Sequence, residues 1–600
     1  MPEPSIAEHG LIGDLRTAAL VAIDGTVDWL CVPRFDGPSV FAAILDAERG
    51  GAWRMAPTCE VSATHQFYFP DSNVLITRFL TEDGVVEIQD FLPVGATDDA
   101  LPRGLVRRVL AVRGAMELAT EVAPRFGYGE HAAEVSGDDD GVRFSHDDEV
   151  LRLRATVALE RGDDDDDGVA RATFALDEGE SAAFALAFDA DTDLDPERAA
   201  DLFDTTVAFW RGWLEQSSYR GRWREMVRRS ALTLKLLTHR PSGAILAAPT
   251  TSLPEQLGGE RNWDYRHVWA RDAAFSAYAL IALGFLEEAR AFVGWLTDRL
   301  READGDGASG PLSVLYDLDG AREVPERRLD HLSGYRDSAP VRVGNDASGQ
   351  RQLDIYGEVV DSVYLFDKHG APISAATWDD LVAVVDWVCD NWDGEDEGIW
   401  ETRAGRKNHT YSRLMCWVAI ERTIRMARRR GLPGDLERWM GARDAIYRQV
   451  MERGYDSERG AFVQHYGSDA LDASLLLMPM VKFVSPTDPR FLSTLDAIGE
   501  ELVSDSLVYR YDPALSPDGL DGEEGTLSIC SFWYVEALTR AGRLEQARVA
   551  LEKMFTYANH LGLYAEQIGR TGDQLGNFPQ AFTHLALISA AINLDRALGD

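Results

Sequence analysis

Lysine is scarce in this 600-residue chain, and so is positive charge in general. Only five lysines stand among 60 basic residues, against 100 acidic ones, which gives a formal net charge of -40 at pH 7. Nucleic acids and anionic membrane surfaces are polyanions, so this charge opposes binding to either. The composition therefore favours neutral or cationic small ligands.

Cysteine and long apolar runs are also lacking. The five cysteines include no Cys-x-x-Cys pair, which argues against a zinc cluster or a disulfide framework. No stretch of 18 or more apolar residues occurs, and the N-terminus lacks the basic and then apolar pattern of a signal peptide. We therefore expect reduced thiols, no membrane partner and a cytoplasmic location.

Cofactor signatures are missing as well. No Gly-x-Gly-x-x-Gly follows a predicted strand, and no phosphate loop with Gly-Lys-Ser or Gly-Lys-Thr is present. Two acidic runs, at 138–140 and 163–167, lack the alternating ligands of a calcium loop and are typical of solvated loop tips. The sequence predicts neither an organic cofactor nor a metal site.

The first third of the chain has the pattern of β-structure. Two pairs of apolar runs each flank an Asp-Gly dipeptide, the signal for a two-residue type I′ hairpin turn. The pairs lie at 17–23 with 26–32 and at 74–80 with 85–91. Further strand-like runs occupy 105–112, 150–159 and 181–188. Evenly spaced hairpins without intervening helices predict an antiparallel β-sandwich.

From about residue 199 the apolar period changes from two to 3.6, which indicates helices. One-sided apolar faces occur at 223–237, 285–300, 381–392, 436–450 and 582–592. Short turns alternate with long connections at 240–268, 302–356, 393–410, 505–525 and 557–577. Helical hairpins closed into a ring would place all the long connections on one rim, where they can build a pocket.

The long connections contain clusters that mix aromatic rings with charged side chains. Sugars need both, because their faces stack on aromatic rings while their hydroxyls require paired donors and acceptors. Taken singly, such a tryptophan is more often a core residue, and an Arg-Asp pair more often a structural ion pair. Glutamates beside apolar groups, in 396–401 and 563–567, can hold one carboxyl neutral while another stays ionised. Together these clusters predict acid–base chemistry on a carbohydrate.

Several of these segments resemble a known family. The runs 262–273, 398–403 and 576–584 resemble glycoside hydrolase family 15, which includes glucoamylases, glucodextranases and trehalases. The runs 6–14, 24–29 and 33–41 resemble the trehalase-like β-domain of its prokaryotic members. The resemblance covers essentially the whole chain. It implies a β-sandwich at 1–195, a helical linker at 196–220 and an (α/α)6 barrel catalytic domain at 221–600.

The resemblance also implies an inverting, exo-acting hydrolase that releases glucose from an α-glucoside. By motif, Glu401 would be the general acid and Glu566 the general base that activates water. Substrate-binding roles are implied for Arg271, Asp272, Trp263, Trp400 and Gln352. An inverting pair must leave room for a water, so its carboxyls are expected about 6.5–9.5 Å apart.

The residues suggest how each glutamate obtains its protonation state. We expect Trp400 and Ile399 to desolvate Glu401 and keep it protonated, and we expect Gln567 or a tyrosine hydroxyl to donate to an ionised Glu566. Other residues compete for these roles. The rival acids are Glu358, the strongest, and Glu397, Glu523 and Glu524, while His267, His409 and His584 could contact substrate.

Trehalose is the expected substrate, because of the N-terminal domain type and the expected location. An α-1,4- or α-1,6-linked glucoside is the alternative, since both would share the glucosyl pocket and differ in the rim loops. A phosphorylase would need no carboxylate base, so the presence of Glu566 argues against a phosphorylase. A non-catalytic sugar-binding protein would have lost one of the two glutamates.

Overall fold

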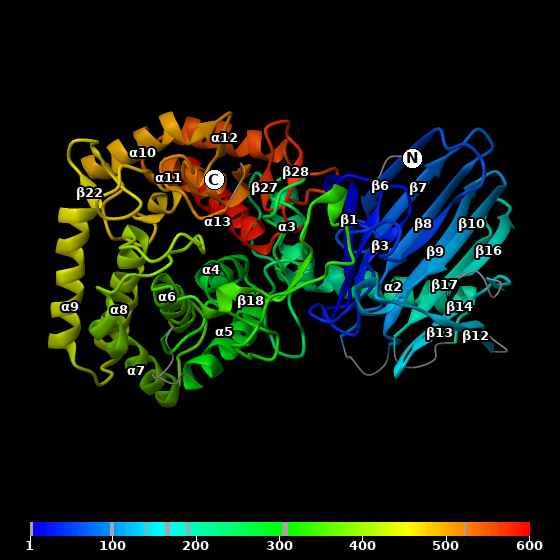
Figure 1. The fold of residues 1–600 in the computed structure, drawn as a ribbon, viewed down its shortest axis with the longest axis horizontal. Helices are drawn as coiled ribbons and strands as arrows, with labels where there is room; N and C mark the ends of the chain where they lie inside the picture. Colours follow the sequence, from blue (N-terminus) through cyan, green and yellow to red (C-terminus); the bar gives the residue numbers. More distant parts are fainter. Residues whose placement is uncertain are drawn as a thin grey trace.

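The computed structural model places a β-sandwich beside a barrel of helices (Figure 1). It describes residues 4–96, 101–138, 141–162, 168–188, 193–302, 310–520, 522 and 524–599. The acidic run 163–167, residues 139–140 and Glu523 lie outside the described residues. In the described part of the chain, none of the helices combines the length and the apolarity needed to cross a bilayer.

The sandwich consists of two antiparallel sheets, as the hairpin pattern predicted. The first sheet contains β1 (His9–Gly13), β2 (Ala18–Ala22), β3 (Val27–Cys31), β4 (Ser39–Phe41), β5 (Ala52–Pro57), β10 (Met116–Ala123), β15 (Glu160–Arg161) and β16 (Ala170–Leu176). The second contains β6 (Ala63–Tyr68), β7 (Leu75–Leu80), β8 (Val85–Phe91), β9 (Gly104–Arg113), β12 (Glu134–Asp138), β13 (Gly141–His146), β14 (Glu149–Ala155) and β17 (Ser181–Ala187). A small helical turn, α1 (Phe126–Gly129), and β11 (His131–Ala132) lie between β10 and β12.

The predicted strand pairs are confirmed, but their predicted turns are wrong. β2 pairs with β3 and β7 with β8, yet four residues rather than two connect each pair. In the first turn Gly25 has a positive φ of 85°, whereas Asp24 uses its side chain to accept a hydrogen bond from the Thr26 amide at 3.0 Å. A type I′ turn needs a positive φ at both central residues, which Asp24 lacks, and its side chain forms an Asx turn instead. The strand predicted at 150–159 ends at Ala155.

A long helix, α2 (Pro196–Leu214), covers the outer face of the second sheet. Asp195 caps its first turn by accepting from the Arg198 amide at 2.7 Å, and Pro196 fits the first helical position. Leu202, Phe203 and Val207 pack against apolar residues of β7, β8, β9 and β17. The amphipathic helix therefore buries its apolar face on the sheet.

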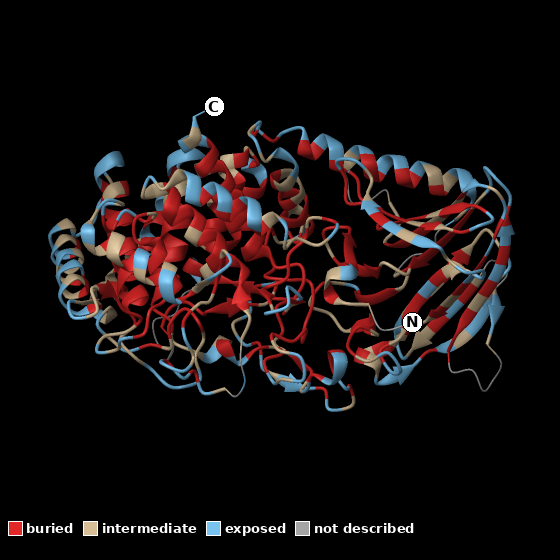
Figure 2. Ribbon diagram, turned by 90° about the horizontal axis from the view of Figure 1, so that it is seen from above, coloured by how far each residue is buried: buried red, intermediate tan, exposed pale blue. Residues whose placement is uncertain are grey.

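The remaining helices form an (α/α)6 barrel. The inner layer is a closed ring in which each element contacts the next: α4 (Ala273–Leu283), α6 (Asp354–His369), α8 (Thr410–Arg430), the 3-10 turn η7 (Ala473–Leu477), α11 (Ser528–Arg540) and α13 (Ala581–Leu598). The outer layer contains α3 (Arg224–Leu236), α5 (Leu286–Arg301), α7 (Ala375–Asn391), α9 (Leu436–Gln449), α10 (Pro489–Glu501) and α12 (Leu544–Phe555). Figure 2 shows the central helices largely buried and the peripheral ones exposed on one side.

The inner helices all begin at one rim of the barrel. The long connections lead into their N-termini, so the prediction that these segments share a rim is confirmed. Short strand pairs stiffen the connections: β18 (Val268–Trp269) with β19 (Leu315–Tyr316), β20 (Arg327–Arg328) with β21 (Arg342–Val343), β22 (Tyr455–Asp456) with β23 (Ala461–Phe462), β24 (Val503–Ser504) with β25 (Leu507–Val508), and β26 (Thr526–Leu527) with β27 (Gln567–Ile568) and β28 (Gln574–Leu575). The positive ends of the helix dipoles therefore point toward this rim.

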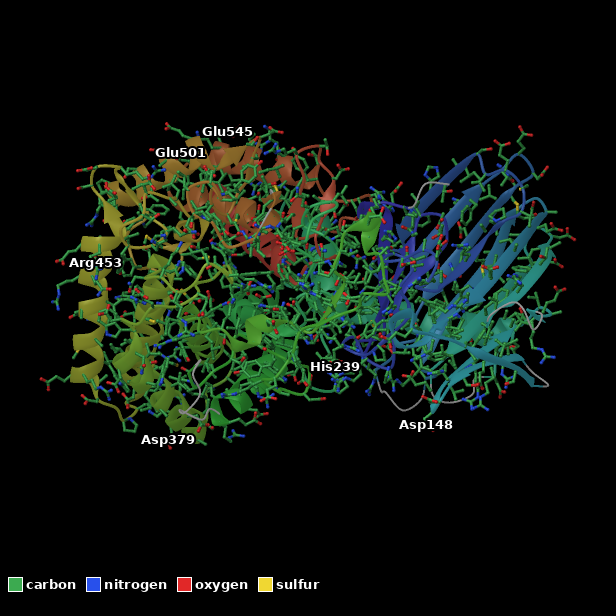
Figure 3. All side chains as sticks on the ribbon, in the orientation of Figure 1. Asp148, His239, Asp379, Arg453, Glu501 and Glu545 are labelled. Carbon is green, nitrogen blue, oxygen red and sulfur yellow. The ribbon has the colours of Figure 1, made fainter. Side chains whose placement is uncertain are left out.

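Arg266 joins the sandwich to the barrel. Its guanidinium holds the buried Asp264 carboxylate at 2.7 and 2.9 Å and donates to the Gly37 carbonyl of the sandwich at 2.8 Å. Trp29 in β3 donates to the Pro249 carbonyl at 2.8 Å. His239, labelled at the junction in Figure 3, packs edge-on against the Phe35 ring. One continuous apolar core spans both parts.

We expect Arg266→Met to lower the free energy of unfolding by roughly 3–5 kcal/mol, because Asp264 would remain buried without its counter-charge. Urea denaturation followed by tryptophan fluorescence measures the change. Arg548→Met removes an arginine whose ion pair with Glu552 is exposed, and it should change stability little. Equal stability of the two variants would contradict a structural role for the Asp264–Arg266 pair.

Candidate active site

The rim of the barrel contains a cavity of about 280 Å³. Four of the five long connections contribute to its wall, which is the arrangement that the loop lengths predicted. The lining residues are Glu255, Arg261, Trp263, Tyr265, Asn345, Asp346, Ala347, Gln350, Trp400, Glu401, Thr402, Arg403, Arg510, Asp518 and Leu520. Charged and aromatic side chains dominate this wall, as expected for a site that binds hydroxyl groups.

Glu401 presents its carboxyl to this cavity from a strained turn. Its φ is 52°, which is uncommon for a residue with a side chain. Gly398 also has a positive φ, and a Cβ there would lie 2.7 Å from the His409 ring, so the turn requires glycine. The Arg271 Nη1 and Trp269 Nε1 atoms donate to Glu401 Oε1 at 2.8 and 3.0 Å.

These contacts differ from the expected apolar surroundings of Glu401. Trp400 directs its indole N–H to both oxygens of Asp472, at 3.1 and 3.0 Å. The Ile399 carbonyl accepts from the Arg271 guanidinium at 2.7 Å. Trp400 and Ile399 therefore each have a polar partner of their own, and the bound oxygen of Glu401 faces two donors.

Glu566 is more deeply enclosed, with 5% of its surface exposed. The Tyr265 hydroxyl donates to its Oε1 at 2.7 Å, which confirms the expected tyrosine donor. Its Oε2 is buried and has no hydrogen-bond partner among the described residues. Burial, reinforced by the neighbouring Glu255, raises the pKa of Glu566 well above its usual range, although Tyr265 and Arg510 oppose the rise.

Two aromatic side chains connect the candidate acid to the candidate base. Tyr265 and Trp269 pack edge to face, with ring centroids 5.2 Å apart. Tyr265 bonds Glu566, and Trp269 bonds Glu401. Both rings come from the connection before α4, so one rigid segment orients the two carboxyls.

Glu255 is a third carboxyl of this site, and the sequence reasoning missed it. It lies in the cavity wall and accepts from Gln567 Nε2 at 2.9 Å, so Gln567 serves Glu255 rather than Glu566. Burial raises the pKa of Glu255 to about 7. The sequence did offer one signal for Glu255, which lies in the same long connection as Trp263. It has no aromatic residue next to it in the sequence, however, and so did not stand out as a candidate.

The five predicted substrate-binding residues take different positions. Trp263 and Trp400 line the cavity, and the Trp263 ring packs against the guanidinium groups of Arg342 and Arg403, each 4.6 Å from its centroid. Gln352 is fully buried and donates to Gln350, which lines the cavity in its place.

Arg271 and Asp272 lie beneath the cavity wall rather than in it. Their side chains approach to 3.5 Å, and Arg271 also bonds Glu401. Burial raises the pKa of Asp272 to about 6, with Glu401 adding to the effect. Arg271 therefore holds Glu401 in place, whatever contact it makes with a ligand.

The rival acids have other partners. The Tyr411 hydroxyl donates to Glu358 at 2.7 Å, and Glu358 faces the far end of the barrel. Glu397 accepts from the Arg351 amide and from Arg406, each at 2.9 Å. Glu524 forms ion pairs with Arg261 and Arg510.

The candidate histidines lie outside the cavity wall. His584 bonds Ser230 at 2.9 Å, and burial lowers its pKa to about 3. Burial has the same effect on the pKa of His409, which falls to about 3, while His267 lies 3.6 Å from Asp264. Within the described residues, no group of three or more histidine, cysteine and acidic side chains is placed to hold a metal ion.

Comparison with known proteins agrees with this architecture. Residues 221–592 match the model of glycosyl hydrolases family 15, and residues 2–202 match the trehalase-like N-terminal model. A trehalase of Mycolicibacterium smegmatis is 41% identical over 99% of this chain and 92% of its own length. A trehalase of Thermoplasma volcanium is 36% identical over 99% of this chain and 94% of its own.

A solved structure shares the fold at low identity. A bacterial glucoamylase complexed with acarbose superposes with a TM-score of 0.71 and 13% identity, covering 98% of this chain and 94% of that one. At this identity the likeness shows the fold alone. The family model and the near full-length relatives establish that this chain is a glycoside hydrolase of family 15.

Proposed function

We propose that this protein hydrolyses α,α-trehalose to two glucose molecules with inversion at the attacked carbon. The observation that carries the proposal is the arrangement of Glu401 and Glu566. They come from two loops, and each accepts a hydrogen bond from one ring of the Tyr265–Trp269 pair. The relatives named trehalases, which match nearly the whole chain, support the choice of substrate. The domain division proposed with it is 1–195, 196–220 and 221–600.

In this mechanism Glu401 gives a proton to the glycosidic oxygen while a water attacks the other face of the sugar. Arg271 and Trp269 already occupy Oε1 of Glu401, so the transferable proton belongs on Oε2. Glu566 takes the water's proton on Oε2, the oxygen without a protein partner. One water is consumed, and no covalent sugar intermediate forms.

The buried carboxyls around the cavity affect this proton transfer. Glu255 and Glu401 both disfavour a negative charge on Glu566 and so raise its pKa. When Glu566 is ionised, this raised pKa makes it a stronger base toward the water. Arg510 and the Tyr265 hydroxyl oppose that effect and stabilise the ionised form. The balance between these groups sets the pH at which Glu566 becomes a base.

Incubation with trehalose, maltose, maltotriose and isomaltose, followed by NMR of the anomeric protons, tests substrate and stereochemistry together. We expect trehalose to be cleaved fastest and to release β- and α-glucose in equal initial amounts, because only the attacked glucose inverts. Release of α-glucose alone would indicate retention. Faster cleavage of maltose would replace trehalose with an α-1,4-glucoside as substrate.

Glu401→Gln and Glu566→Gln should each lower kcat by at least about 10²-fold, the lower end expected when a general acid or base is lost. Each change keeps the side-chain shape, so circular dichroism and the thermal unfolding midpoint should stay close to those of the parent. Glu397→Gln, in the same loop as Glu401, is the matched control and should retain activity. Near-normal turnover by either catalytic variant would remove that residue from the mechanism.

Glu255→Gln should move the acidic limb of the kcat/KM profile to lower pH by roughly one unit, because loss of a neighbouring negative charge lowers the pKa of Glu566. The amide oxygen can still accept from Gln567, so the local fold is retained. Glu260→Gln removes an exposed charge from the same connection and should leave the profile in place. An unmoved limb in Glu255→Gln would show that Glu255 does not influence the base.

A further inference from the structure

A second cavity, of about 200 Å³, lies within the barrel toward the end opposite the candidate active site. It is lined by residues of α4, α6, α8, α11 and α13 and of the segment that follows η7. Its inner end is formed by Glu358 and Tyr411, and its outer end by Lys368 at the C-terminus of α6. Neither candidate catalytic glutamate contributes to it.

The walls of this second cavity are largely apolar. They are formed by Ala274, Phe275, Leu365, Leu477, Met480 and Val481, with Tyr278 and Tyr364 adding aromatic surface. At the inner end the Glu358 carboxyl accepts from Tyr411, and burial raises its pKa well above the usual range. A neutral, hydrogen-bonded acid at this end suits an apolar occupant.

Cations gather around the same cavity. Arg422, Arg425 and Arg540 each pair with an acid, namely Asp361, Glu421 and Glu536. The Arg422 Nη1 atom is nevertheless buried and has no hydrogen-bond partner among the described residues, while the residue as a whole is 4% exposed. One guanidinium nitrogen is therefore available to an acceptor that the described residues do not supply.

Two lysines complete the cluster, from a chain that contains only five. Lys368 and Lys482 are both exposed at the outer end of the cavity, and neither forms an ion pair within the described part of the chain. Lys482 has a φ of 66°, a conformation that costs energy for a residue with a side chain. The amides of Lys482 and Phe483 bond the carbonyls of Pro479 and Met478, so this conformation ends the turn that follows η7 and brings Lys482 to the cavity.

The helix dipoles account for only part of this cluster. Lys368 and Arg540 lie in the last turns of α6 and α11, where a cation is favourable. Lys482 lies outside these helices, and its pKa is lowered by burial and by the nearby charges of Lys368, Arg425 and Arg422. Solvent screens part of this repulsion because both lysines are exposed, and a bound anion would offset the rest.

We propose that the second cavity binds a small organic acid, with its carboxylate at Lys368, Lys482 and Arg422 and its apolar body against Leu477 and Val481. An inorganic anion would leave the apolar walls uncovered, and an uncharged apolar molecule would leave the cations unpaired. An acid with both parts satisfies both surfaces. The site is independent of the reaction proposed for the first cavity.

Isothermal titration calorimetry of the full-length protein with sodium octanoate tests the proposal. Octanoate should bind, and octanamide, which has the same chain without the charge, should bind roughly tenfold more weakly or worse. Inorganic phosphate should likewise bind more weakly than octanoate. Failure of octanoate to bind, or equal binding by octanamide or phosphate, would overturn the proposed ligand class.

Variants locate the site. Lys368→Gln/Lys482→Gln should weaken octanoate binding roughly tenfold, and it breaks no ion pair between described residues. Leu365→Trp, at a half-buried wall position, should weaken it by occupying the space of the apolar chain. Lys553→Gln, whose partner Asp505 is exposed, is the matched control and should bind normally. Unchanged affinity in both cavity variants would place octanoate elsewhere and refute the site.

Discussion

The Asp264–Arg266 ion pair fixes the segment on which both candidate catalytic groups depend. It is fully buried and attaches the segment to the sandwich through the Gly37 carbonyl. Tyr265, which lies between the two residues of the pair, reaches Glu566, and a few residues later Trp269 and Arg271 reach Glu401. A shift of this segment would move both carboxyls together. The sandwich therefore contributes to the site by holding its central loop, although the cavity itself is lined by residues of the barrel.

The barrel separates charge along its axis. The N-termini of its inner helices point to the rim where Glu255, Glu401 and Glu566 gather, and the positive helix ends offset part of their repulsion. The C-termini of the same helices point to the opposite end, where Lys368 and its cationic neighbours line the second cavity. One arrangement of parallel inner helices therefore places the candidate catalytic carboxyls at the positive helix ends and a cluster of cations at the negative ends.

Periodicity and loop lengths predicted most of the architecture. The period-two runs correspond to β2, β3, β7, β8, β9 and β17, and the 3.6-period runs to α3, α5, α7, α9 and α13, because burial of one face imposes these patterns locally. The predicted type I′ turns were wrong because neither Asp24 nor Asp83 has a positive φ. Asp24 bonds the Thr26 amide through its side chain, and in the second turn the Thr81 hydroxyl accepts from the Gly84 amide. The pairing of strands that lie far apart in the chain, such as β10 with β5 and β16, has no local signal in the sequence.

The sequence by itself determined which loops hold the chemistry and which two glutamates to consider, because unusual residues cluster in the long connections. Only the tertiary structure decided what surrounds each carboxyl. Glu401 meets donors 130 and 132 residues away in sequence, and Glu566 meets Tyr265, 301 residues away. The place of Glu255 in the site and the second cavity were likewise revealed only by the tertiary structure. Electric fields and burial depend on distance through space, and residues adjacent in sequence, such as Trp400, turned to partners of their own.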